Sequence, residues 1–129
     1  MDLEETTELR LQFGKRGGIL PVVVQEFASG QILMLASVNE EAFEYTLQNK
    51  VAAFYSTSRK KLWIKGETSG NYLKMINILV DCDQDALVYQ VSLEKGGVCH
   101  TFNQHNENRK ACFYRRVIDE SGKFEFLEL

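Results

Sequence analysis

The stretch Asp81-Cys82-Asp83-Gln84-Asp85 places three carboxylates and one thiol within five residues. Apolar runs at residues 72–81 and 86–93 flank it, and we expect them to pair as the two strands of a hairpin. In an extended chain the three aspartates would share one face, and Cys82 would point to the other. Carboxylates this close repel one another unless a cation lies among them, and Mg²⁺ prefers oxygen ligands. The stretch therefore indicates a magnesium site, with a plain polar turn as the alternative.

The three cysteines, Cys82, Cys99 and Cys112, are candidates for a second metal site. Three thiolates in tetrahedral geometry hold Zn²⁺ and leave a fourth position for water. Their spacing matches no zinc-finger pattern, so the fold would have to bring the thiols together. His100, beside Cys99, is either a fourth zinc ligand or a general base. The alternative is that the cysteines are buried and act as small hydrophobic residues.

Length and composition predict one domain that covers residues 1–129, with 44% hydrophobic and 26% charged residues. The net charge of -3 offers no global attraction for nucleic acid, so we expect no nucleic-acid partner. No apolar run approaches the roughly 20 residues of a membrane helix, and the acidic start of the chain does not resemble a signal peptide. We therefore expect a cytoplasmic protein with reduced thiols and no membrane partner.

The hydrophobic pattern predicts a β-rich α+β domain with a mixed or antiparallel sheet and one main helix. The helix is expected over residues 39–49, with Asn39 as its N-cap and two glutamates in its first turn. Residues 1–12 are expected to form a short amphipathic helix or a frayed arm, followed by a glycine-rich turn at 13–18. The predicted strands are residues 20–27, 32–36, 52–56, 61–65, 72–81, 86–93 and 113–118, with a last segment at 124–127.

Residues 56–71 combine hydroxyls, glycines and cations around the strand expected at 61–65. These groups are typical of phosphate-binding sites. Trp63 could stack on a base, and Glu67 could contact a hydroxyl or a metal ion. The alternative is an ordinary basic strand followed by a glycine turn.

Taken together, these stretches resemble the phosphoribosyl-AMP cyclohydrolase family of histidine biosynthesis. The most specific strings are Trp63-Ile64-Lys65-Gly66-Glu67-Thr68-Ser69-Gly70 and Asp81-Cys82-Asp83-Gln84-Asp85-Ala86-Leu87. Cys99-His100-Thr101 and Cys112-Phe113-Tyr114-Arg115 follow in family order, and the resemblance covers roughly residues 19–116. The chain departs from the family pattern at Phe102, which replaces a glycine, and in a longer link between the last two cysteines.

The resemblance implies a hydrolase that opens the adenine ring of 1-(5-phosphoribosyl)-AMP at its N1–C6 bond by means of a zinc-activated water. It implies Zn²⁺ on the three cysteines, Mg²⁺ on Asp81, Asp83 and Asp85, and His100 as the catalytic proton shuttle. It also implies an intertwined homodimer with shared metal sites, in which one chain supplies Cys82 and its partner the other two cysteines. The expected contacts to the phosphorylated nucleotide are Arg59, Trp63, Lys65, Glu67, Ser69 and Gly70.

Two other functions remain open from the sequence. A different zinc-dependent nucleobase hydrolase, such as a deaminase, would use the same chemistry, although the H-x-E…P-C-x-x-C signature of zinc deaminases is absent. A non-catalytic binding module would hold zinc with four protein ligands and leave no position for water. The resemblance favours the stand-alone cyclohydrolase, with no fused second enzyme.

Overall fold

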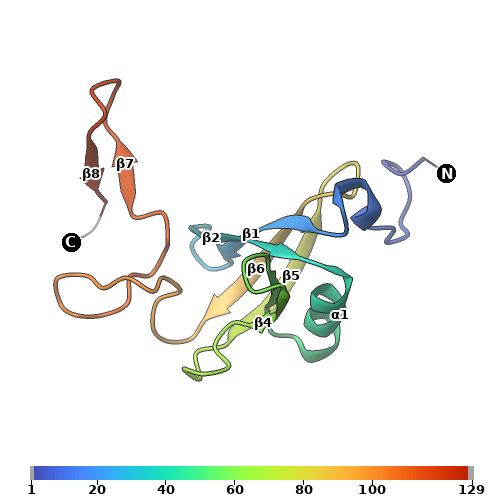
Figure 1. Ribbon diagram of the computed structural model, residues 1–129, viewed down its shortest axis with the longest axis horizontal. Coiled ribbons are helices and arrows are strands. Elements are labelled where there is room, and N and C mark those ends of the chain that lie inside the picture. The colour runs from blue at the N-terminus through green and yellow to red at the C-terminus, as the bar shows by residue number, and fades with distance from the viewer. Residues whose placement is uncertain (1, 128–129) are drawn as a thin grey trace.

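A four-stranded mixed sheet forms the centre of the molecule, with the strand order β2-β1-β6-β5 (Figure 1). The structure is a computed structural model and describes residues 2–127. The outer pairs, β1 with β2 and β5 with β6, are antiparallel, whereas the central pair, β1 with β6, is parallel. The four strands are β1 (Leu20–Glu26), β2 (Ile32–Val38), β5 (Leu73–Val80) and β6 (Leu87–Leu93).

One face of this sheet builds the hydrophobic core. Alternate residues of β1 are buried, as are alternate residues of β6, because successive side chains of a strand point to opposite faces. Helix α1 (Glu40–Asn49) and the small hairpin of β3 (Ala53–Ser56) and β4 (Lys61–Ile64) add side chains such as Phe43 and Phe54 to the same core. This core thus positions the β3–β4 hairpin, which carries two of the expected substrate contacts, Arg59 and Trp63.

Helix α1 begins where the sequence predicts it. The Asn39 side chain accepts a hydrogen bond of 2.9 Å from the backbone N–H of Ala42, which satisfies one of the free donors of the first turn. The helix ends before Lys50, whose left-handed backbone returns its N–H to the carbonyl of Thr46. The expected helix at 39–49 is therefore confirmed.

A second hairpin, of β7 (Arg115–Val117) and β8 (Phe124–Phe126), lies apart from the central sheet (Figure 1). All six of its strand residues are exposed, among them Val117 and both phenylalanines. The guanidinium of Arg109 lies 4.2 Å from the ring centre of Tyr114, next to β7. A two-stranded hairpin is marginally stable alone, so such ring contacts contribute to holding it.

The β-rich α+β class, the mixed sheet and the single main helix are confirmed within residues 2–127. The helix considered for residues 1–12 is wrong for the described part, because residues 2–12 form an arm of turns and extended chain. The expected turn at 13–18 contains a short 3₁₀-helix, η1 (Phe13–Arg16). The strand expected at 113–118 is shorter and covers only β7. The domain limits of 1–129 and the homodimer stay predictions.

Replacing Thr46 with Val should lower the free energy of unfolding by about 1–3 kcal/mol, because a buried backbone donor loses its partner. The Thr46 hydroxyl donates to the carbonyl of Ala42 and accepts from the N–H of Ala53, both at 3.0 Å. Valine keeps the shape of the side chain and removes both bonds. Urea unfolding would measure the change, with the exposed Thr57→Val as a control expected within about 0.5 kcal/mol of wild type. Equal stabilities of the two variants would contradict the role of the hydroxyl.

Tyr89 should make the fold sensitive to alkaline pH. Burial raises the pKa of Tyr89 from 10.0 to about 12, and the nearby Thr46 hydroxyl opposes part of the rise. The native state favours the protonated phenol. The contribution of Tyr89 to the free energy of unfolding is therefore fully present below pH 10 and is lost as the pH rises towards 12. Between about pH 9 and pH 11, the Tyr89→Phe protein should lose about 1.3 kcal/mol less stability than wild type. Urea unfolding at both values tests this, with the exposed Tyr72→Phe expected to follow wild type.

Candidate functional site

The acidic stretch forms the tight turn between β5 and β6. The Asp81 carboxylate accepts hydrogen bonds from the backbone N–H groups of Asp85 at 2.9 Å and Ala86 at 3.1 Å. Gln84 adopts a left-handed backbone with φ of 57°. These features curl the chain, so the expectation of an extended stretch with alternating faces is wrong. The three carboxylates nevertheless converge, with one oxygen from each within 4.8 Å of the others.

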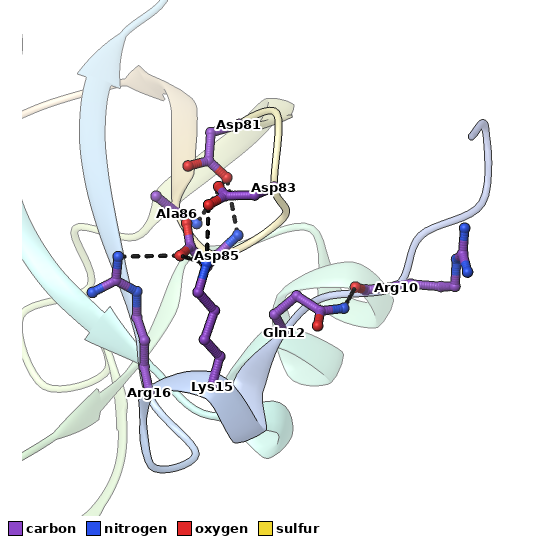
Figure 2. A network of polar contacts seen from close by, with 8 residues as sticks. All are labelled: Arg10, Gln12, Lys15, Arg16, Asp81, Asp83, Asp85 and Ala86. Atoms are coloured by element: carbon purple, nitrogen blue, oxygen red, sulfur yellow. Dashed lines mark hydrogen bonds and ion pairs between the residues drawn. The ribbon is translucent and has the colours of Figure 1, made fainter. Parts of the chain in front are cut away.

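Two basic residues of η1 contact this turn (Figure 2). The ammonium of Lys15 lies 3.0 Å from Asp83 Oδ2 and 2.8 Å from Asp85 Oδ2, and Arg16 Nη2 lies 3.2 Å from the same Asp85 oxygen. The hydrogen bond from Lys15 is the main cause that holds the pKa of Asp85 well below its ordinary value. Burial raises the pKa of Asp81, although backbone hydrogen bonds oppose the rise. The turn therefore combines ionised carboxylates with cations from a distant part of the chain.

Gln84 fastens the N-terminal arm to the same turn. Its side-chain oxygen accepts from the N–H of Arg10 at 2.6 Å, and its amide donates to the carbonyl of Glu8 at 3.2 Å. Its own carbonyl accepts from the N–H of Gln12 at 2.8 Å. Cys82 is exposed and lines a cavity of about 330 Å³ between the arm and the turn.

Cys99 and Cys112 come together at the other end of a long link. The backbone of Cys99 pairs with Arg109, and a bridge between Phe102 and Asn108 closes the link into a small hairpin. Gly97 permits this pairing, because a Cβ there would collide with the Arg109 carbonyl. The additional residues of the link therefore form a closed loop that leaves the two cysteines as neighbours.

The two thiols influence each other's ionisation. Burial tends to raise the pKa of Cys99, but hydrogen bonds from the Thr101 hydroxyl and backbone and from Cys112 lower it overall. Burial and the neighbouring Cys99 charge raise the pKa of Cys112. Ionisation of Cys99 therefore hinders that of Cys112, and a metal ion between them would offset this repulsion, because thiols bind metal as thiolates.

Lys65 and His100 lie beside this thiol pair. The Lys65 ammonium donates to the carbonyl of Val98 at 2.7 Å. Burial lowers the pKa of Lys65, and the negative charges of Cys112 and Cys99 oppose the decrease. The exposed His100 lines a cavity of about 160 Å³ whose other lining residues include Lys65, Ser69, Cys99 and Asn108.

A larger cavity of about 590 Å³ lies along β3 and β4. It offers one indole, the cations of Arg59 and Lys61, and several hydroxyls. Ser69 lines this cavity and the smaller one beside the thiols, so the two adjoin. Gly66 closes the loop between them with φ of 90°, and a Cβ there would collide with the backbone of Asn71. The residues of the larger cavity are Ser56, Ser58, Arg59, Lys61, Leu62, Trp63, Ile64, Glu67, Thr68 and Ser69.

The structure brings most of the expected substrate contacts together. Arg59, Trp63, Glu67 and Ser69 line the larger cavity, and Lys65 joins them at the smaller one. Gly70 lies instead at a third cavity, of about 220 Å³, which shares Asn71 with the smaller one. The hydroxyls of Ser56, Ser58 and Thr68 also line the larger cavity, and their place in a hydroxyl-rich stretch was the signal for them.

The expected metal ligands fall into two places. Within residues 2–127, the aspartate trio is the one group of three or more acidic, cysteine or histidine side chains close enough to hold a metal ion. Its oxygen donors fit Mg²⁺. Cys99 and Cys112 provide two of the thiols that Zn²⁺ would need, and Cys82 is not grouped with them in the single chain. Across residues 2–127, the chain has no helix long and apolar enough to cross a membrane.

Sequence comparisons show which proteins this chain is similar to. The family model described as phosphoribosyl-AMP cyclohydrolase matches residues 34–114. The chain is 48% identical to the phosphoribosyl-AMP cyclohydrolase of Archaeoglobus fulgidus over 84% of this chain and 94% of that protein. It is 45% identical to the protein of the same name from Streptococcus mutans, over 88% of this chain and 97% of that one. Against the histidine biosynthesis bifunctional protein of Aquifex aeolicus the identity is 44% over 91% of this chain, which spans about half (53%) of that relative.

Substituting Asp81 should separate its role in the turn from its charge. Asp81→Asn keeps an oxygen that accepts from Asp85 and Ala86, so its free energy of unfolding should stay within about 0.5 kcal/mol of wild type. Asp81→Ala removes the acceptor and should cost about 1–2 kcal/mol. Urea unfolding of both proteins would measure the difference. Equal destabilisation by Asp81→Asn and Asp81→Ala would contradict the prediction that Asp81 stabilises the turn through these two hydrogen bonds.

Proposed function

The chain belongs to the phosphoribosyl-AMP cyclohydrolase family, and we propose that it hydrolyses the N1–C6 bond of 1-(5-phosphoribosyl)-AMP in histidine biosynthesis. The product is the ring-opened formimino-carboxamide ribonucleotide. One observation carries the proposal: the family match over residues 34–114 includes both adjoining cavities, the acidic turn and all three cysteines. We also expect the protein to work in the cytoplasm.

The larger cavity suits the nucleotide part of this substrate. The substrate carries two phosphates, and Arg59 and Lys61 supply positive charge beside the hydroxyls of Ser56 and Ser58. The Trp63 ring offers a face on which a base can stack. A base stacked on Trp63 would point past Ser69, which lines both cavities, into the smaller cavity beside the thiol pair.

The donor sets fit two kinds of metal ion. Cys82, Cys99 and Cys112 would hold Zn²⁺, and Asp81, Asp83 and Asp85 would hold Mg²⁺. Bound zinc supplies a Lewis acid that lowers the pKa of a water molecule towards neutrality. Because one chain gathers two of its thiols, Cys82 would come from a second copy, which makes the active unit a homodimer with shared metal sites.

His100 and Lys65 would manage charge around the reacting ring. N1 substitution leaves the adenine ring cationic, so C6 is electron-poor and open to attack by water. His100 is exposed at the smaller cavity, where its imidazole can accept a proton from the attacking water and return it to the ring nitrogen. Lys65 places an ammonium group near both thiols and favours their ionised form.

Paired cysteine variants would test the shared site. Cys82→Ala and Cys112→Ala proteins should each lose bound zinc and ring-opening activity, because each lacks one ligand in every site. After the two are unfolded and refolded together, about half of the dimers should be mixed, and each mixed dimer restores one of its two sites. We expect about a quarter of the wild-type zinc content and activity, measured by mass spectrometry and by conversion of phosphoribosyl-AMP.

A Cys99→Ala and Cys112→Ala mixture is the matched control. Both ligands belong to the same half of the site, so no mixed dimer holds an intact set and recovery should be absent. Recovery in this control, or full zinc content in the Cys82→Ala protein alone, would refute the shared site. Ammonia release by the wild-type protein in place of the ring-opened nucleotide would indicate a deaminase instead.

A further inference from the structure

The acidic turn is already occupied by a positive charge of the chain's own. The Lys15 ammonium bridges one oxygen of Asp83 and one of Asp85 at 3.0 and 2.8 Å (Figure 2). Arg16 adds a contact of 3.2 Å to the same Asp85 oxygen. An ammonium between two carboxylates neutralises the same oxygens that a divalent cation at this turn would require.

The backbone that presents Lys15 is fixed to the turn. The N–H of Gln12 donates to the carbonyl of Gln84, within the turn, at 2.8 Å. The Phe13 ring packs edge-on against Phe43 of α1, with ring centres 6.4 Å apart. Both anchors lie at the start of the 3₁₀-helix and hold it against the turn, so Lys15 faces the carboxylates as part of the fold.

The lysine side chain can leave without any change of the backbone. About half of it, 51%, is exposed, and its four-carbon stem is flexible. The ion pair with Asp83, whose side chain is 44% exposed, is weak, whereas the shorter pair with Asp85, whose side chain is 5% exposed, breaks only if the incoming cation neutralises that carboxylate. A bound divalent cation brings twice the charge of the ammonium and would repel it.

We infer that Lys15 is an internal counter-ion, which holds the carboxylates of Asp83 and Asp85 together in the metal-free protein and is displaced when a divalent cation binds at the acidic turn. The inference rests on the proposed function, which assigns these carboxylates to Mg²⁺. Lys15 thus acts as a positioning residue that also weakens cation binding, because each cation must first break the ammonium contacts.

Direct binding of Mn²⁺ to the full-length, zinc-loaded protein tests this, with free Mn²⁺ counted by electron paramagnetic resonance. Lys15→Met keeps the stem and removes the charge, so it should bind Mn²⁺ about fivefold or more tightly than wild type. Lys15→Arg keeps the charge and should resemble wild type. Lys123→Met removes a charge from the distant β7–β8 turn and should leave the affinity unchanged.

Thermal unfolding supplies a second measurement. Without divalent cations, Lys15→Met should melt below wild type, because its carboxylates lose their counter-ion. Saturating Mg²⁺ should then raise the melting temperature of Lys15→Met by more than that of wild type. A merely structural lysine would lower stability without tightening cation binding.

The Asp83→Asn variant distinguishes a failure of the proposed metal site from a failure of the counter-ion role of Lys15. If this variant loses Mn²⁺ binding while Lys15→Met binds as wild type does, the carboxylate site stands and the counter-ion role is refuted. If Asp83→Asn binds Mn²⁺ as wild type does, the proposed metal site falls, and the competition with Lys15 falls with it. Tighter binding by Lys15→Met, abolished by adding Asp83→Asn, supports the inference.

Discussion

Three carboxylates within 4.8 Å of one another repel, and this end of the molecule is arranged around that repulsion. Lys15 and Arg16 of η1 contact the turn between β5 and β6 (Figure 2), and Gln84 attaches the N-terminal arm to the same turn. η1 brings two positive charges to the carboxylates, and the arm supplies hydrogen-bond donors to the oxygens of Gln84 within the turn. These contacts thus connect the N-terminal arm and η1 to the central sheet, whose first strand begins at Leu20.

Local sequence signals predicted most of the fold. Alternating apolar residues and the Asn39 cap are contained in short segments, so the strands and α1 could be recognised directly. The residue types of the acidic site were also predictable, but their geometry was not. The turn depends on the left-handed Gln84 backbone, and the Lys15 contact joins residues 68 positions apart, so neither leaves a local pattern.

The proposed substrate and zinc sites show the same difference between predictable residue types and unpredictable geometry. Residues 56–71 indicated a phosphate-binding site because their cations, hydroxyls and glycines lie close together in the sequence, and several of these residues line the larger cavity. Cys99 and Cys112 lie close together because the chain between them folds into a closed hairpin, which their spacing in the sequence could not show. Gly70 was placed with the substrate contacts by motif, and it lines a different cavity at the end of the loop that its N–H closes onto the Gly66 carbonyl.

The loop beyond Cys99 has a practical value for experiments. The bridge between Phe102 and Asn108 and the hydrogen bond from Asn103 to Glu107 seal residues 103–107 at their base. Lengthening a surface loop that is sealed in this way costs little, about 0.6 kcal/mol for each doubling of its length. The loop is therefore a suitable insertion point for a fluorescent label or affinity tag, which would report from beside the thiol pair while leaving the backbone that holds it unchanged.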